Sequence, residues 1–326
     1  MKCINSKRIL VFLLFSGLLL ISGCSGEKYK MAYDVDSSVS SFRFAQYGSL
    51  DKAHGFAYDL CVTDTDVMEE TNVNTSESAT ALLCDVNKKD VIFAKSIHEQ
   101  MEPASLTKVL TALVALKHAD LEDQLVASSN VKIQESGASL IGLEQGDVMT
   151  LDQALHALLL PSGNDAAILI AENIGGSVEG FAQMMNDEAK LLGATNSHFV
   201  NPHGLTQEGH YVTAYDLYLI FNEAIKYDKF TEIINTNEYN TIYRDKNGDP
   251  KEFSCSSTNL YLKGTYNAPE HVTVIGGKTG TTNSARNCLV LLAKDGTGSP
   301  YISIILKCKE RGILYEEMTD LLYEIN

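Results

Sequence analysis

The sequence predicts an α/β fold, an α+β sandwich in which N- and C-terminal strands form one antiparallel sheet around a helical insert. β-type runs open and close the main domain, at residues 79–84, 91–95, 272–279, 287–294 and 301–307. Helical patterns occupy residues 105–118, 151–160, 165–173, 177–192 and 313–325. Because strands and helices do not alternate along the chain, a sheet of βαβ repeats is not expected.

The first and last elements have clear local signals. Residues 85–90 are polar and separate two apolar β-type runs, which predicts a hairpin. The helix at 105–118 is apolar on nearly every side, as expected for a helix buried in the centre of a domain. The closing pattern at 313–325 is amphipathic and therefore predicts a helix with one buried face.

The ends of the other helices are marked by residues that stop or start helices. Pro161 breaks the helix that begins at 151, and the glycines at 175–176 end the next one. Gly193 takes the position that commonly follows a helix C-terminus. The segment Thr213-Ala-Tyr-Asp216 has the pattern of a capping box and opens a further helix.

Composition excludes several classes of protein. The chain has 326 residues and a formal net charge of −16, and 44% hydrophobic residues suffice for a buried core. A charged fraction of 21% excludes wholesale disorder. One apolar run, near the N-terminus, excludes a multi-span membrane protein. The acidic balance argues against a nucleic-acid partner, since such partners need basic surfaces.

The N-terminus predicts an exported lipoprotein. Basic residues precede the apolar run 9–21, which is short for a membrane span and typical of a secretion signal. The run ends in Leu20-Ile-Ser-Gly-Cys24, which resembles the bacterial lipobox. We therefore expect residues 1–23 to be removed and Cys24 to be lipidated, anchoring the protein to the outer face of the cell membrane. An ordinary signal peptide with an incidental cysteine is the alternative.

The division of the remaining chain follows composition. Residues 24–78 are acidic, and their tail at 64–78 has little to bury, which predicts a tether or loosely ordered segment. Partial alternation at 56–62 leaves open whether part of this segment joins the main domain. The main domain is expected over residues 79–326.

Cysteine usage gives no metal site. Cys3 leaves with the signal and Cys24 is lipidated, which leaves five of the seven cysteines: Cys61, Cys84, Cys255, Cys288 and Cys308. No CxxC occurs, and no histidine lies at zinc-finger spacing from any of them. Buried free thiols are favoured, while a disulfide such as Cys61–Cys84 stays open in an exported protein.

The first candidate for catalysis is Ser105-Leu-Thr-Lys108. Three residues apart on a helix, the two side chains share one face, so the amine could take the hydroxyl proton. Pro103 marks the first helical turn, where the N–H of Ser105 has no intrahelical partner and could stabilise an oxyanion. The alternative is a plain helix-start serine with a lysine that reaches solvent.

Two further motifs follow. Ser162-Gly-Asn164 lies in a turn after an apolar helix and is also compatible with ordinary turn chemistry. Gly277-Lys-Thr-Gly280 lies at the end of a predicted strand. A P-loop reading is excluded because Val272 stands where the first glycine is required and no helix follows.

The order SxxK, SxN, KTG is that of penicillin-binding proteins and β-lactamases. Together with Asn201-Pro-His-Gly-Leu205, the segments Pro103-Ala-Ser-Leu-Thr-Lys108, Ser162-Gly-Asn-Asp-Ala166 and Gly277-Lys-Thr-Gly280 resemble the low-molecular-mass serine D-alanyl-D-alanine carboxypeptidases. The resemblance covers roughly residues 79–326 and implies a β-lactamase/DD-peptidase-like fold.

The resemblance implies a mechanism without metal or organic cofactor. Ser105 attacks the carbonyl between the terminal D-alanines of the peptidoglycan stem peptide, and Lys108 accepts its proton as a neutral amine. Ser162 relays the proton to the leaving amine, and Asn164 holds Lys108 or the substrate amide. The residues implied for binding the substrate carboxylate and the oxyanion are Lys278, Thr279, Gly280 and Thr281. β-Lactam antibiotics would acylate Ser105.

The sequence departs from the family after KTG, where Thr281-Thr282 stands in place of a common aromatic residue. A class A β-lactamase is disfavoured because no ExxxN lies between Ser162 and Lys278. A D,D-endopeptidase and a non-catalytic β-lactam-sensing or wall-binding lipoprotein remain alternatives. His198, His203 and His210 do not share one helix face, so they predict no metal site.

Overall fold

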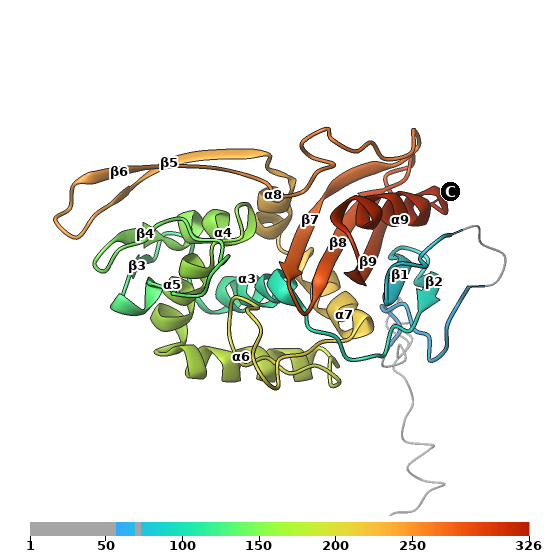
Figure 1. Cartoon of the computed structure of the whole chain (residues 1–326), viewed down its shortest axis with the longest axis horizontal. Coiled ribbons are helices and arrows are strands. Elements are labelled where there is room, and N and C mark those ends of the chain that lie inside the picture. The colour runs from blue at the N-terminus through green and yellow to red at the C-terminus, as the bar shows by residue number, and fades with distance from the viewer. Residues whose placement is uncertain (1–56, 69–72, 326) are drawn as a thin grey trace, which may run out of the picture. The chain divides into compact units, whose positions relative to one another are not determined.

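Over the described residues, 57–68 and 73–325, a computed structural model of the chain contains a main sheet of five antiparallel strands in the order β2-β1-β9-β8-β7 (Figure 1). The strands are β1 Thr80–Asp85, β2 Asp90–Lys95, β7 Thr273–Thr282, β8 Arg286–Lys294 and β9 Pro300–Cys308. The N-terminal hairpin therefore pairs with the C-terminal strands, through β1 and β9, which confirms the predicted fold class.

The main sheet is covered on both faces, which explains why β8 is apolar without interruption from Cys288 to Ala293. Val290 and Leu292 face one hydrophobic cluster, shared with the helical region. Leu289 and Leu291 face a second cluster, built with the closing helix α9 (Arg311–Tyr323). Successive side chains of a strand point to opposite faces, so a strand covered on both sides needs apolar residues at every position.

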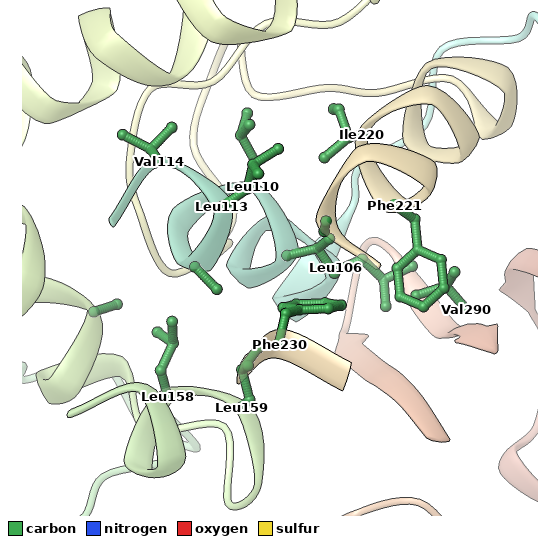
Figure 2. Close-up of a cluster of buried hydrophobic side chains, with 14 of the residues drawn as sticks. Leu106, Leu110, Leu113, Val114, Leu158, Leu159, Ile220, Phe221, Phe230 and Val290 are labelled. Atoms are coloured by element: carbon green, nitrogen blue, oxygen red, sulfur yellow. The ribbon is translucent and has the colours of Figure 1, made fainter. Parts of the chain in front are cut away.

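The helical region lies between the two halves of the sheet in sequence. Its elements are η1 Ala104–Leu106, α3 Thr107–His118, η2 Ser129–Val131, α4 Leu151–Leu159, α5 Asn164–Gly175, α6 Val178–Leu191, α7 Ala214–Ala224 and α8 Asp228–Asn235. Helix α3 lies at its centre, and Figure 2 shows Leu106 and Leu110 among side chains from α4, α7, α8 and β8. The prediction of a buried central helix is confirmed.

The helix boundaries follow the local signals. Helix α4 ends before Pro161, and Gly176 ends α5 in the left-handed conformation with a φ of 72°. Thr213 caps α7 by accepting a hydrogen bond from the N–H of Asp216. The reciprocal half of the expected capping box differs, because the N–H of Thr213 donates to Ser197 Oγ and the Asp216 carboxylate accepts from the same hydroxyl.

A second sheet was not expected from the sequence. Its four strands have the order β3-β4-β5-β6, with β3 Gln124–Val126, β4 Val148–Thr150, β5 Glu238–Arg244 and β6 Pro250–Ser256. β3 and β4 are three residues long, and β5 alternates between exposed residues and half-buried ones, with Tyr243 buried. Such strands have no apolar run. Gln153 of α4 anchors β5 instead, by donating to Thr241 Oγ1 and to the carbonyl of Ile242.

The described residues before β1 contact the domain. The sequence had left open whether part of this segment joins it. Cys61 is fully buried, with its N–H donating to the Tyr218 hydroxyl and its carbonyl accepting from the Tyr215 hydroxyl. Val67 forms an isolated antiparallel bridge with Ala94 of β2. The predicted signal and Cys24 lie outside the described residues. In the described part of the chain, no helix has the length and apolarity needed to cross a membrane.

Candidate active site

A polar cleft opens where the start of α3, the turn between α4 and α5, and strand β7 meet. Its lining includes Ser105, Gly137, Ser139, Ser162, Asn164, Gly204, Thr258, Thr279, Gly280, Thr281 and Arg311. The three motifs, which are spread over residues 105–280 of the sequence, thus share one cleft, since Ser105, Asn164 and Thr279 all line it.

Ser105 lies in the short turn η1 that leads into α3. Ala104 before it has a φ of 48°, in the left-handed region that a residue with a β-carbon rarely adopts. Such strain is common at functional sites and here presents the serine at the floor of the cleft.

Lys108 lies one turn further and is fully buried. Its Nζ lies 2.9 Å from Ser105 Oγ, and it donates to Asn164 Oδ1 at 2.6 Å and to the backbone oxygen of His203 at 2.7 Å. The amine is therefore held against the hydroxyl by two fixed acceptors. This arrangement suits a base that takes the proton of Ser105.

The second motif forms the turn that starts α5. Ser162 has a φ of 67°, and its Oγ is buried without a hydrogen-bond partner among the described residues. An unpaired buried hydroxyl beside a cleft is available to a ligand. Asn164 is the first residue of α5 and contacts Lys108, as described above.

Asp165 fixes this turn to the neighbouring loop. Its buried carboxylate accepts hydrogen bonds from the backbone N–H groups of Ile141, Gly142 and Leu143 at 2.9–3.1 Å. The loop also contacts the turn through Ser139, whose Oγ donates to the carbonyl of Pro161. These contacts hold the second motif in place.

The third motif lies on β7, an edge strand of the main sheet. Lys278 is 1% exposed, and its Nζ donates to the carbonyl of Thr279 at 2.8 Å. The Thr279 hydroxyl shares a hydrogen bond of 2.7 Å with Thr258. A β-carbon on Gly280 would lie 3.1 Å from the nitrogen of Ser105, so β7 passes directly beside the serine.

Both lysines have lowered pKa values. Burial, with the nearby charge of Lys278, holds the pKa of Lys108 well below its usual range, against the opposing effect of Asp165. Burial lowers the pKa of Lys278 to about 7. A neutral amine at position 108 is a competent general base near neutral pH, whereas an ammonium is not.

The segment Asn201-Pro-His-Gly-Leu205 borders the serine from the other side. Gly204 has a φ of 84°, and a β-carbon on it would lie 1.8 Å from the carbonyl oxygen of Ala104. The side chain of Asn201 accepts from the N–H of Gly204 and donates to the carbonyl of Leu205. Only glycine permits this close approach, so the segment supports the strained turn that presents Ser105.

The histidines have structural partners. His210 Nε2 lies 2.9 Å from Thr107 Oγ1, and His203 Nδ1 accepts from the N–H of Leu205. Burial lowers the pKa of His210 to about 4 and that of His203 to about 3, so both are neutral. Within residues 57–68 and 73–325, no group of three or more His, Cys, Asp or Glu side chains could hold a metal ion.

Among the cleft residues that sequence reasoning missed are Arg311 and Thr258. Arg311 lines it and donates from Nη2 to the carbonyl of Thr258 at 3.2 Å. Thr258 in turn meets Thr279. One signal was available for Arg311, because a cation in the first turn of a helix opposes the helix dipole and needs another reason to be there.

Residues 66–310 match the family described as D-alanyl-D-alanine carboxypeptidase, Peptidase S11. The chain belongs to this family. The resemblance drawn from its three motifs is thereby confirmed.

Two relatives show how much of a related protein this chain spans. DacF of Bacillus subtilis (strain 168), a D-alanyl-D-alanine carboxypeptidase, is 37% identical over 232 residues, which cover 70% of this chain and 57% of the relative. DacB2 of Mycobacterium tuberculosis, of the same description, is 32% identical over 266 residues, which cover 80% and 87%.

Among solved structures, the Streptomyces K15 DD-transpeptidase superposes with a TM-score of 0.72 at 26% identity, over 78% of this chain and 98% of that one. This likeness confirms the β-lactamase/DD-peptidase-like fold that the motifs imply for the family.

Proposed function

We propose that the chain is a serine D-alanyl-D-alanine carboxypeptidase that removes the terminal D-alanine from peptidoglycan stem peptides through an acyl-enzyme on Ser105. The observation that supports this most directly is the hydrogen bond of 2.9 Å between Lys108 Nζ and Ser105 Oγ, formed in the cleft shared by all three motifs. Membership of the family supports the substrate class.

In the proposed acylation, Lys108 takes the proton of Ser105 as the hydroxyl oxygen attacks the peptide carbonyl. The Asn164 oxygen and the His203 carbonyl hold the amine in place and stabilise the ammonium that forms. The Ser162 hydroxyl, which has no partner among the described residues, would pass a proton to the leaving amine. The N–H groups of Ser105 and Thr281 would bind the developing oxyanion.

The free carboxylate of the substrate is proposed to bind beside Thr279, Gly280 and Arg311. Lys278 is almost fully buried, and with a pKa of about 7 it supplies positive charge to this part of the site when it is protonated. Arg311 reaches the same part of the cleft and can present its planar guanidinium to a carboxylate. A requirement for this carboxylate is what separates a carboxypeptidase from an enzyme that cuts within a chain.

Slow deacylation of a β-lactam adduct is also proposed. No aspartate or glutamate is among the described residues that line the cleft. Without a carboxylate to activate water, the penicilloyl-enzyme should persist. Rapid turnover of a chromogenic cephalosporin would instead favour the β-lactamase alternative.

The decisive experiment follows peptide mass with a soluble variant that begins at Gly26. It is incubated with a pentapeptide ending in D-Ala-D-Ala, and Ser105→Ala is the control. Loss of a single alanine with the unchanged enzyme alone supports the proposal. A folded enzyme that releases no alanine but cleaves a cross-linked peptide would be an endopeptidase, and one that only binds penicillin would be a sensor.

We also propose that the chain is exported, loses residues 1–23 and is held at the outer face of the cell membrane by a lipid on Cys24. The lipobox-like sequence supports this, as does the extracytoplasmic substrate proposed above. Cys24→Ala should release the protein from the membrane fraction. Retention of that variant in the membrane would contradict the lipid anchor.

A further inference from the structure

Cys61 and Cys84 form a contact pair that the catalytic site does not use. Cys84 lies on β1, and Cys61 lies in the segment that precedes it, yet both are fully buried in the same hydrophobic cluster. The Cys61 thiol is directed at β1, the strand that carries Cys84. Two buried cysteines in one cluster, with one thiol directed at the strand that carries the other, meet the first requirement for a disulfide, which is proximity.

The position of Cys61 is fixed from several sides. Its backbone is held by the hydroxyl groups of Tyr215 and Tyr218 on α7, as described above. Its thiol donates to the carbonyl of Asp85 at 3.3 Å, next to Cys84. The sulfur is therefore directed at β1 by neighbours that do not depend on Cys84.

The remaining described cysteines offer no equivalent pair. Cys288 and Cys308 lie on the neighbouring strands β8 and β9 but belong to hydrophobic clusters on opposite faces of the main sheet. Cys255 lies on β6, in the second sheet. Pairing any of these would require the sheet to be rebuilt.

We propose that Cys61 and Cys84 form a disulfide in the exported protein, fixing the segment that enters the domain to strand β1. This segment joins the proposed membrane anchor to the catalytic domain, so the bond would add a cross-link where the segment meets the domain. The proposal rests on the export proposed above, because a reducing compartment would keep both thiols.

The bond forms by exchange with a disulfide, either of a low-molecular-mass thiol or of a thiol oxidoreductase. The thiolate of one cysteine attacks that disulfide and releases one thiol, and the second thiolate then attacks the mixed disulfide and releases the other. Both protein thiols are oxidised and one external disulfide is reduced. Exchange takes place during folding, before burial closes the site.

The test uses the full chain isolated from the membrane of a secreting host, denatured and alkylated without reduction. Trypsin leaves both cysteines in the peptide 53–88, and a glutamyl endopeptidase then cuts between them, after Glu69, Glu70 or Glu77. We expect two fragments that stay linked until a reductant is added, with neither cysteine alkylated. Alkylation of both Cys61 and Cys84 in the exported protein would overturn the proposal.

Thermal denaturation gives a second reading. A bond between Cys61 and Cys84 closes a loop and should therefore raise the melting temperature of the protein. Adding a reductant should lower that melting temperature by about 5–10 °C. The double variant Cys61→Ala/Cys84→Ala should lose this response, and Cys255→Ser should keep it. A wild-type protein whose melting temperature ignores the reductant would count against the bond.

Export is measured separately, from the N-terminal peptide of the same sample. If the host keeps the chain inside the cell, disulfide formation is tested on the purified full chain. That chain is partly unfolded in urea with oxidised glutathione and then returned to buffer without urea. A linked pair supports the disulfide, whereas free or glutathione-bearing Cys61 and Cys84 overturn it. Failure of export and failure of the disulfide are thus distinguishable.

Discussion

At the scale of single residues, the ionisation of Lys108 decides when the proposed nucleophile is active. Only the neutral amine can accept the proton of Ser105, so acylation should fall as the pH drops through the pKa of Lys108 and level off above it. The charge of Lys278 helps to keep that pKa low. Lys278→Gln removes this charge, raises the pKa of Lys108 and should move the acid limb up by about 0.5–1 pH unit.

The measurement is the rate of acylation by a fluorescent penicillin between about pH 5 and about pH 9. Lys278→Arg is the matched control, because it carries a positive charge at every pH measured and should not move the acid limb up. An acid limb at the same pH in wild type and Lys278→Gln would show that Lys278 does not act on the base.

Asp165 makes a second prediction at this scale. Asp165→Asn replaces one acceptor oxygen by an NH₂ group that faces backbone donors, so the free energy of unfolding should fall by about 1–3 kcal/mol. Acylation should also slow, since the turn that holds Ser162 loses its support. Urea denaturation and penicillin acylation measure the two effects. Asp245→Asn is the control, because this exposed carboxylate also accepts backbone N–H groups but lies in a distant hairpin turn.

The residues found from sequence are those that lie in local motifs. Ser105 and Lys108 are three positions apart, and one helical turn is enough to bring them together. Arg311 and Asp165 were not singled out, because their roles arise from contacts with Thr258 and with residues 141–143. Tertiary contacts of this kind leave no periodic signal in a single sequence.

At the scale of elements, the close approach of residues 201–205 to the start of α3 should be intolerant of any side chain. Gly204→Ala places a β-carbon against the carbonyl of Ala104, so the strained turn that presents Ser105 must move. We expect penicillin acylation to fall by at least about 100-fold, because small displacements of a nucleophile have large effects on rate. Gly209→Ala is the matched control in the same region.

Gly209 has a φ of 80°, close to that of Gly204, but a β-carbon on it would meet no atom nearer than 3.8 Å. Both variants therefore suffer the same backbone strain, and only one suffers the clash. Equal acylation rates in Gly204→Ala and Gly209→Ala would contradict the role assigned to this approach.

Elements that local signals mark were predicted from the sequence, whereas elements that depend on distant contacts were not. Helices α4 to α7 were located from Pro161, Gly193 and similar stops, which act on their own neighbourhood. The hairpin β5–β6 was not located, because its strands are polar and are held by Gln153 from a helix far away in sequence. Helix α8 was also missed; its Ile234 carbonyl packs against Gly276 of β7, a contact made only in the fold.

At the scale of the whole molecule, the question is where the folded unit begins. The segment 73–78 contacts the closing helix, since the N–H of Glu77 and the hydroxyl of Ser78 both donate to the buried carboxylate of Glu317. Lys95 of β2 in turn donates to the carbonyls of Thr75 and Ser78. The first and last parts of the described chain are thus joined through this segment.

A chain that starts at residue 79 should therefore be less stable than one that starts at residue 57. The shorter chain leaves the Glu317 carboxylate buried without two donors and uncovers Cys84 beneath Cys61. We expect the free energy of unfolding to fall by about 3–5 kcal/mol, or the chain not to fold, because uncompensated buried charge is strongly destabilising. Thermal denaturation and penicillin acylation of both chains measure this. Equal melting temperatures would place the start of the folded unit at residue 79, whereas the expected loss makes residues 57–78 part of the enzyme.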